Sequence, residues 1–299
     1  MDKKKQLRGG ICSTLGGICW GFTGVCAQNL FAIADVDSAW LATVRMIVAG
    51  TIMIVFGMIW NKPKEMTRIF HSKKDTIRLA IFGIAGLMFV QYTYFTAILY
   101  SNAGTATTLQ YTCPIMIMVY TCLRKRQAPG WIGVISIIMV VFGVFLLACH
   151  GDIRGLAISV QGLIWGLLSA VAQAAYSIIP GDLIHRYGSL PITGFGMLIG
   201  GLSLGFVRRA WTVSVSLNPE AYLMIVIIIL MGSILAYLIH MRGIADIGPM
   251  KATLFVSIEP VSAAFFSLIW MHTPLGLADA AGIVLVVAAV ILYNMKAKQ

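Results

Sequence analysis

The sequence predicts an all-α integral membrane protein, with ten transmembrane helices arranged as two inverted repeats of five. Three observations lead to this fold class. Of the 299 residues, 59% are hydrophobic and only 11% are charged, and the mean hydropathy is +0.88. This length accommodates about ten spans of roughly 20 residues with short connections. Finally, similar sequence patterns recur at a nearly constant separation, which is typical of an internal repeat.

The first repeat is predicted to cover residues 1–150. Its apolar stretches are each long enough to cross the hydrocarbon core of a bilayer, and polar or basic connections separate them. A basic flank precedes the first stretch without a small-residue cleavage site, so we expect a retained first helix and no removed signal peptide. The expected spans are Gly10–Ile33, Ser38–Trp60, Ile77–Tyr100, Thr105–Cys122 and Trp131–Cys149.

The second repeat is predicted to cover residues 151–299 and to follow the same order. Because five spans are an odd number, the second copy would enter the membrane upside down, as in the inverted repeats of secondary transporters. The expected spans are Leu156–Ile179, Ile192–Val207, Ala221–Met241, Gly248–Trp270 and Ala280–Met295.

The repeat is visible in matching residues of corresponding helices. A Trp-Gly pair and an Ala-Gln pair recur 145 residues apart, and a proline in the middle of the fourth span recurs 146 residues later in the ninth. Prolines inside spans break or kink the helix, so we expect these two to mark helix kinks. The matched residues are Trp20 with Trp165, Gln28 with Gln173, and Pro114 with Pro260.

The positions of lysine and arginine predict the orientation. Of the 22 such residues, only Arg154, Arg208 and Arg209 fall in one set of connections and Arg45 falls inside a span, while all others lie in the opposite set or at the ends. Basic residues concentrate on the cytoplasmic side. We therefore expect a multi-pass protein of the cell membrane with both termini in the cytoplasm.

Several function classes are disfavoured by what the spans contain. The net charge of +11 resides in short loops, which leaves no basic domain for nucleic acid. No paired carboxylates and no two-histidine spacing indicate catalysis or a metal site, and no glycine-rich loop indicates nucleotide binding. We expect no enzyme activity, no metal and no cofactor. An intramembrane enzyme or a non-transporting scaffold remains a remote alternative.

Two charged side chains inside spans require an explanation, because charges at membrane depth are costly. Glu259 could bind a proton or a cationic group, or it could form an ion pair with Arg45 and hold helices together. Pro260 leaves the carbonyl of Val256 without its helical donor, so a backbone acceptor is also expected there. Arg45 could bind a carboxylate or phosphate of a substrate, or reach the headgroups instead.

Aromatic and amide side chains at symmetric positions suggest a binding site between the repeats. An indole wall next to an amide suits a small amphipathic metabolite. For each residue the alternative is ordinary helix packing with a satisfied amide. The expected substrate-binding residues are Trp20, Gln28, Arg45, Gln91, Tyr94, Gln110, Tyr111, Trp165, Gln173 and Tyr176.

These features together resemble a known family. The Trp-Gly pairs of the first and sixth spans, Arg45-Met46, the run Tyr94–Tyr100 and the segments ending TCP and IEP are similar to the ten-helix EamA-type branch of the drug/metabolite transporter (DMT) superfamily. The resemblance implies a secondary active transporter that moves a small metabolite by alternating access, with export of an amino acid or related compound as the leading expectation. An uptake carrier or exchanger for a metabolite or organic anion is the alternative. Coupling to a proton or a counter-solute, and the oligomeric state, stay open.

Overall fold

The computed structural model describes residues 3–60, 63–126, 128, 130–149, 158–247, 252 and 255–296. Within these ranges all regular structure is helical. Six of the helices described are long and apolar enough to cross a membrane, and a shorter apolar helix covers Leu277–Leu292. The chain is thus an all-helical protein with the spans of a multi-pass membrane protein. The six long helices are Lys4–Ile33, Ser38–Trp60, Lys73–Tyr100, Trp131–Cys149, Ser189–Arg208 and Pro219–Ile244.

The first half of the chain contains two long helices, a short connecting segment, and three further helical regions. Side-chain caps start two of these regions: Ser72 accepts a hydrogen bond from the Asp75 amide, and Asn102 accepts one from the Thr105 amide. The elements are α1 (Lys3–Ile33), α2 (Ser38–Trp60), α3 (Pro63–Thr67), η1 (Arg68–His71), α4 (Lys73–Ile81), η2 (Phe82–Met88), α5 (Phe89–Tyr100), α6 (Ala103–Gln110), α7 (Cys113–Lys125) and α8 (Trp131–Cys149).

The second half follows a similar order. Ser159 caps its first helix by accepting from the Gly162 amide, and Asn218 caps a later one by accepting from the Ala221 amide. The elements are α9 (Val160–Ile178), α10 (Gly181–Tyr187), α11 (Ser189–Arg208), η3 (Ala210–Thr212), α12 (Pro219–Ile227), η4 (Ile228–Leu235), α13 (Ala236–Ile247), α15 (Glu259–Trp270) and α16 (Leu277–Lys296).

Helix ends differ from the predicted ends in several places. α1 begins at Lys3 and not at Gly10, and α13 continues past the predicted end at Met241 to Ile247. The short helix α10 was not predicted. The predicted boundary between the repeats, at residues 150 and 151, lies outside the described residues, as does the beginning of the predicted span Gly248–Trp270.

Both prolines predicted to kink a span instead stand at the start of a new helix. The fourth predicted span is broken at Tyr111 and Thr112, and α7 then begins with Pro114 in its first turn. Likewise, α15 begins at Glu259 with Pro260 in its first turn. Proline is tolerated there because the first amides of a helix have no helical acceptor. The prolines thus end one helical segment and begin the next.

Two other regions depart from α-helical geometry without a break. Residues Phe82–Met88 and Ile228–Leu235 form π-helical segments, η2 and η4, inside the rods α4–η2–α5 and α12–η4–α13. Such wide turns are rare and often occur at functional sites. The two segments begin at positions 82 and 228, which are 146 residues apart.

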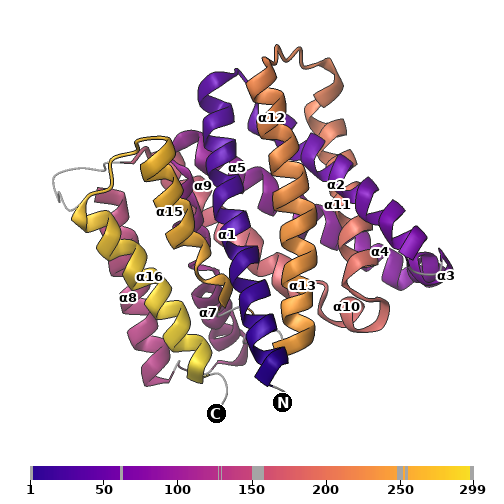
Figure 1. Cartoon of the computed structure of the whole chain (residues 1–299). Coiled ribbons are helices and arrows are strands. Elements are labelled where there is room, and N and C mark those ends of the chain that lie inside the picture. The colour runs from indigo at the N-terminus through magenta and orange to yellow at the C-terminus, as the bar shows by residue number, and fades with distance from the viewer. Residues whose placement is uncertain are drawn as a thin grey trace.

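The rods form one bundle in which helices from the two halves pack against each other (Figure 1). α1 packs between α13 and α15, α2 packs against α11, and α8 lies beside α16. α1 begins and α16 ends at the same end of the bundle, which we call the terminal face; we call the other end the far face. α3, α4 and α10 also lie toward the terminal face (Figure 1).

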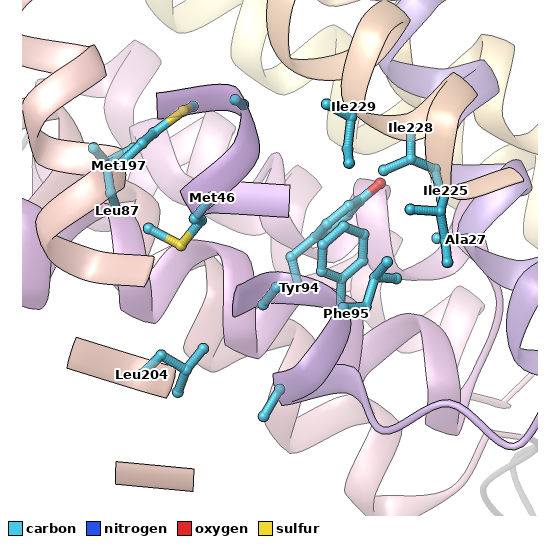
Figure 2. Close-up of a cluster of buried hydrophobic side chains, with 14 of the residues drawn as sticks. Ala27, Met46, Leu87, Tyr94, Phe95, Met197, Leu204, Ile225, Ile228 and Ile229 are labelled. Carbon is cyan, nitrogen blue, oxygen red and sulfur yellow. The ribbon is translucent and has the colours of Figure 1, made fainter. Parts of the chain in front are cut away.

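The main core lies where α1, α2, α5, α11 and the α12–η4 rod meet. Figure 2 shows Tyr94 and Phe95 of α5 between isoleucines of α12 and η4 on one side and Met46, Leu87 and Met197 on the other. Small residues allow the close approach: a Cβ at Gly50 of α2 would lie 2.8 Å from the Leu198 amide nitrogen of α11. The core thus joins residues from both halves.

Candidate functional site

The two broken helices meet through Tyr111 and Glu259. The Tyr111 hydroxyl lies 3.0 Å from the Glu259 Oε2 and 2.9 Å from the carbonyl oxygen of Val256, and its single hydrogen is shared between these two acceptors. Val256 is the residue whose carbonyl Pro260 leaves without a helical donor, so a side chain from the other break satisfies it. The Val256 carbonyl, which was predicted to lack a helical donor, therefore accepts a hydrogen bond from Tyr111.

A glycine lets α1 approach this junction. A Cβ at Gly21 would lie 2.8 Å from the carbonyl oxygen of Glu259 and 2.8 Å from the amide nitrogen of Ala263. A real Cβ does not approach backbone atoms so closely, so α1 and α15 can only pack this way with glycine at position 21. The Trp-Gly pair of the first span therefore sets the distance between α1 and Glu259.

Arg45 is buried, with 7% of its surface exposed, and its partners are neutral. Its Nε donates to the Ser233 Oγ at 2.7 Å, and its Nη1 donates to the Gln91 Oε1 at 3.1 Å. The guanidinium carbon lies 5.2 Å from the centre of the Phe95 ring. An arginine has five N–H donors, so two of them are used by these contacts.

The ion pair between Arg45 and Glu259, one of the alternatives for Glu259, is not formed as a direct contact. None of the ion pairs between described residues joins the two side chains, although they interact electrostatically across the site. Glu259 is held by Tyr111, and Arg45 is held by Ser233 and Gln91. The Arg45 guanidinium and the Glu259 carboxyl group thus interact across the site without forming a direct ion pair.

Trp20 extends the site toward the terminal face. Its indole Nε1 donates to the Gly232 carbonyl at 2.7 Å, inside the π-helical segment η4. The ring makes edge contacts with Tyr237 at 6.2 Å and His240 at 5.3 Å. A side chain of the first half thus binds a carbonyl inside a π-helical turn of the second half, and such turns often occur at functional sites.

Two pairs of hydroxyl groups complete the polar lining. Tyr94 and Thr107 are 2.8 Å apart and join α5 to α6. Tyr176 and Tyr237 are 2.5 Å apart, and Thr193 lies 3.2 Å from the Tyr237 hydroxyl, so α9, α11 and α13 are joined. Buried hydroxyls are thereby satisfied at helix junctions.

Gln28 makes three side-chain hydrogen bonds toward the far face. Its Oε1 accepts from the Ala103 amide at 2.9 Å and from the Ser267 Oγ at 2.8 Å, and its Nε2 donates to the Thr273 Oγ1 at 3.1 Å. These bonds join α1 to α6 and α15. Gln28 thus connects helices of both halves through its amide.

The matched residues of the second half have different surroundings. Trp165 makes an edge contact with Tyr92 at 5.4 Å, and its indole forms none of the hydrogen bonds found between described residues. Gln110 ends α6 and Gln173 lies in α9; both are half-buried. The structure therefore concentrates the polar contacts around Trp20, Arg45 and Glu259, and not around their symmetric counterparts.

Ser233, Tyr237 and Thr193 are contacts of the site that the sequence analysis did not include. One signal was present for Ser233: Gly232-Ser233 stands 146 residues after Gly86-Leu87, so a repeated glycine is followed by serine in one copy and by leucine in the other. A polar residue that replaces an apolar one within a repeat indicates a local role.

A helical bundle in which both halves contribute buried polar groups to interrupted helices is the construction of membrane transport proteins. The EamA-like transporter family model matches residues 7–149 and 160–295. The chain therefore belongs to the EamA-like transporter family, as the resemblance within the DMT superfamily implied.

Relatives and one solved structure agree with this assignment. The chain is 34% identical to the uncharacterized inner membrane transporter YicL of Salmonella typhimurium, over 95% of this chain and 94% of the relative. It is 19% identical to the uncharacterized transporter YcbK of Bacillus subtilis, over 93% and 90%. A solved crystal structure shares the fold with a TM-score of 0.66 at 15% identity, covering 100% of this chain and 99% of the other.

Proposed function

We propose that this protein is a secondary active transporter that moves a small metabolite across the cell membrane by alternating access. In this proposal, residues 1–150 and 151–299 form two inverted five-helix repeats, ten spans in all, with both termini in the cytoplasm. The cargo is an amino acid or a related compound, and the physiological direction is export.

The arrangement of helices supports the repeats. The packing is similar when corresponding helices are compared. α1 packs against α13 and α15, and its counterpart α9 packs against their counterparts α5 and α7, and also against α6. The π-helical segments and the helix breaks recur 146 residues apart, and the family model matches the chain twice. α1 begins and α16 ends at the same face of the bundle, which agrees with an even number of spans (Figure 1).

The observation that carries the cargo class is the unneutralised pair Arg45 and Glu259. Arg45 has further N–H donors suited to a carboxylate, since a planar guanidinium binds carboxylates through two parallel bonds. Glu259 would receive an ammonium group or a proton, with Tyr111 orienting it. Trp20, Gln91, Tyr94 and Tyr176 would line the apolar and hydroxyl surfaces of the same site. A molecule with both charges would neutralise both groups at once.

A thermal-shift screen of the purified protein against a metabolite panel, at two pH values, tests the cargo class. A compound that binds only the folded protein raises its melting temperature. At a concentration one hundred times its Kd, the compound adds about 2.7 kcal/mol to the free energy of unfolding. We expect hits among amino acids. Hits confined to amines without a carboxylate would contradict the role of Arg45.

Proteoliposome transport of the compounds found then tests the two charged groups. Arg45→Met should abolish binding, whereas the exposed Arg208→Met, at the far face, should leave it intact. If Glu259 carries the coupled proton, Glu259→Gln should abolish pH-driven transport but retain binding and exchange. If Glu259 holds the ammonium group of the cargo, the variant should lose binding as well. If Glu259→Gln loses folding and all activities together, its role is structural and the coupling proposal fails.

A further inference from the structure

A second group of charged residues joins the two halves at the terminal face, away from the site described above. Asp75 lies in the first turn of α4, and Arg186 binds both of its carboxylate oxygens, at 2.7 and 2.8 Å. The Tyr187 hydroxyl donates to the same carboxylate at 2.7 Å. The Asp75 side chain is 6% exposed. A buried carboxylate with a bidentate arginine and a phenol is a strong and directional contact.

Further contacts hold the short helix α10 in place. Arg68 of η1 donates to the Arg186 carbonyl, and the guanidinium groups of Arg68 and Arg186 lie 5.2 and 5.3 Å from the Tyr187 ring centre. α10 is bounded by Pro180 and by Gly188, whose φ is +84°. Polar and aromatic side chains thus attach α10 to the segment 68–75, and Leu183 of α10 is buried in the main core.

α10 also connects two elements of the candidate site. It follows α9, which carries Tyr176, and precedes α11, which carries Thr193; both hydroxyls contact Tyr237. Tyr237 in turn makes the edge contact with Trp20. A displacement of α10 away from Asp75 would therefore shift both supports of Tyr237.

A second bidentate pair on the terminal face provides a comparison. Arg8 of α1 binds Asp246 of α13 at 2.7 and 2.8 Å. Here the helices themselves are in close contact, since a Cβ at Gly243 would lie 3.0 Å from the Gly9 carbonyl oxygen. At the far face, the ion pair between Arg208 and Asp37 measures 3.4 Å, with both side chains over 40% exposed, and such pairs contribute little.

We infer that Asp75, Arg186 and Tyr187 form a latch that closes the terminal face and opens during the transport cycle. This inference rests on the proposed alternating access, in which opening one face breaks contacts between the halves there. The contacts that join α10 to the segment 68–75 are made by side chains, whereas α1 and α13 approach each other through glycines. Arg8 and Asp246 stay together as α1 and α13 move as one packed pair. The latch selects between conformations and does not contact the cargo.

Hydrogen–deuterium exchange of the full-length protein in phosphatidylcholine nanodiscs tests the latch. Asp75→Asn should raise exchange about tenfold in residues 180–190 and in the terminal-face ends of α9 and α11, because local opening becomes more frequent. The same variant should slow exchange at the far face, in residues 209–218 and 271–276, because one face closes as the other opens. Tyr187→Phe should give a smaller change of the same pattern.

The matched control is Arg8→Gln, which removes an equally short bidentate pair on the same face. It should leave residues 180–190 and the far face unchanged. The charge-exchanged variant Asp75→Arg with Arg186→Asp should return exchange toward the wild-type pattern. Faster exchange at α10 without the reciprocal change at the far face would overturn the latch and leave a local structural contact. This measurement needs no cargo, so a failure of the latch is separate from a failure of the proposed transport.

Discussion

The π-helical segments η2 and η4 occupy matching positions but have different neighbours. η4 (Ile228–Leu235) receives two polar side chains: Trp20 donates to the Gly232 carbonyl, and Arg45 donates to the Ser233 hydroxyl. η2 (Phe82–Met88) packs against α11 and α9 through glycines, and a Cβ at Gly83 would lie 2.8 Å from the Gly196 carbonyl oxygen.

The side chain after the repeated glycine shows the divergence most directly. Leu87 stands where the other copy has Ser233, and it is buried in the core with 2% of its surface exposed (Figure 2). The unusual backbone is kept in both copies, while the hydrogen-bonding side chains gather at one. The difference indicates that the π-helical geometry serves apolar packing in the first half and polar contacts within the protein in the second.

The largest expected effect follows from making η2 resemble η4. Leu87→Ser should reduce the free energy of unfolding by about 3 kcal/mol, because it leaves a cavity and a buried hydroxyl without a hydrogen-bond partner. Chemical denaturation in detergent micelles measures this loss. The volume-conserving Leu87→Met should cost less than about 1.5 kcal/mol. Equal stability of Leu87→Ser and wild type would mean that η2 can host polar groups, and the contrast between the segments would be lost.

Removing the serine hydroxyl from η4 should have the next largest effect. Ser233→Ala removes the acceptor of the buried Arg45 Nε and should cost about 2 kcal/mol. The control is Ser136→Ala, since Ser136 is fully buried and its hydroxyl has no hydrogen-bond partner in the described part of the chain. That variant should be neutral or stabilising. A similar loss for both serines would argue that the Arg45 contact contributes nothing beyond side-chain volume.

Much of the helix order was predictable because hydrophobic length determines a span. Ser38–Trp60 and Trp131–Cys149 were predicted with the ends that the structure shows. The breaks at Pro114 and Pro260 were located by proline chemistry, although the structure starts new helices there. The π-helical segments have no comparable signal, because their apolar residues suit an α-helix equally well.

The candidate site was predictable in its residue types but not in its partners. Arg45 and Glu259 were identified because charges in spans are costly, but the ion pair considered as one alternative is not formed. Which hydroxyl or carbonyl satisfies each group depends on the rotation of rods such as α12–η4–α13, and a wide turn changes that rotation. Ser233 and Gly232 could therefore only be assigned from the three-dimensional structure.

A smaller effect distinguishes the two matched tryptophans. Trp20→Phe removes the hydrogen bond to the Gly232 carbonyl and should cost about 1 kcal/mol in the free energy of unfolding. Trp165→Phe keeps the edge contact with Tyr92 and removes none of the hydrogen bonds found between described residues, so it should cost less than Trp20→Phe. Denaturation of both variants under one condition gives the comparison. If Trp165→Phe costs as much as Trp20→Phe, ring volume explains both residues and the indole bond to η4 is not a distinguishing feature.

The smallest effect concerns the ends of the rods that contain η2 and η4, and it depends on pH. Hydrogen bonds and charge from Arg8, together with the charge of Arg242, lower the pKa of Asp246 below its ordinary value. A lowered pKa stabilises the folded protein above the unfolded-state pKa, and the contribution is lost as the pH falls through the folded-state pKa. The stability difference between wild type and Arg8→Gln should therefore be full at neutral pH and shrink below about pH 5.

The control is at Tyr100, 146 residues before Asp246, where the corresponding rod ends. The Tyr100 carbonyl accepts a hydrogen bond from the Ser159 hydroxyl at 2.8 Å. Because neither group titrates in this range, Ser159→Ala should cost the same at every pH. Melting curves of the two variants from neutral to acidic pH provide the measurement, and a pH-independent difference for Arg8→Gln would contradict the assignment of Asp246 as the titrating partner.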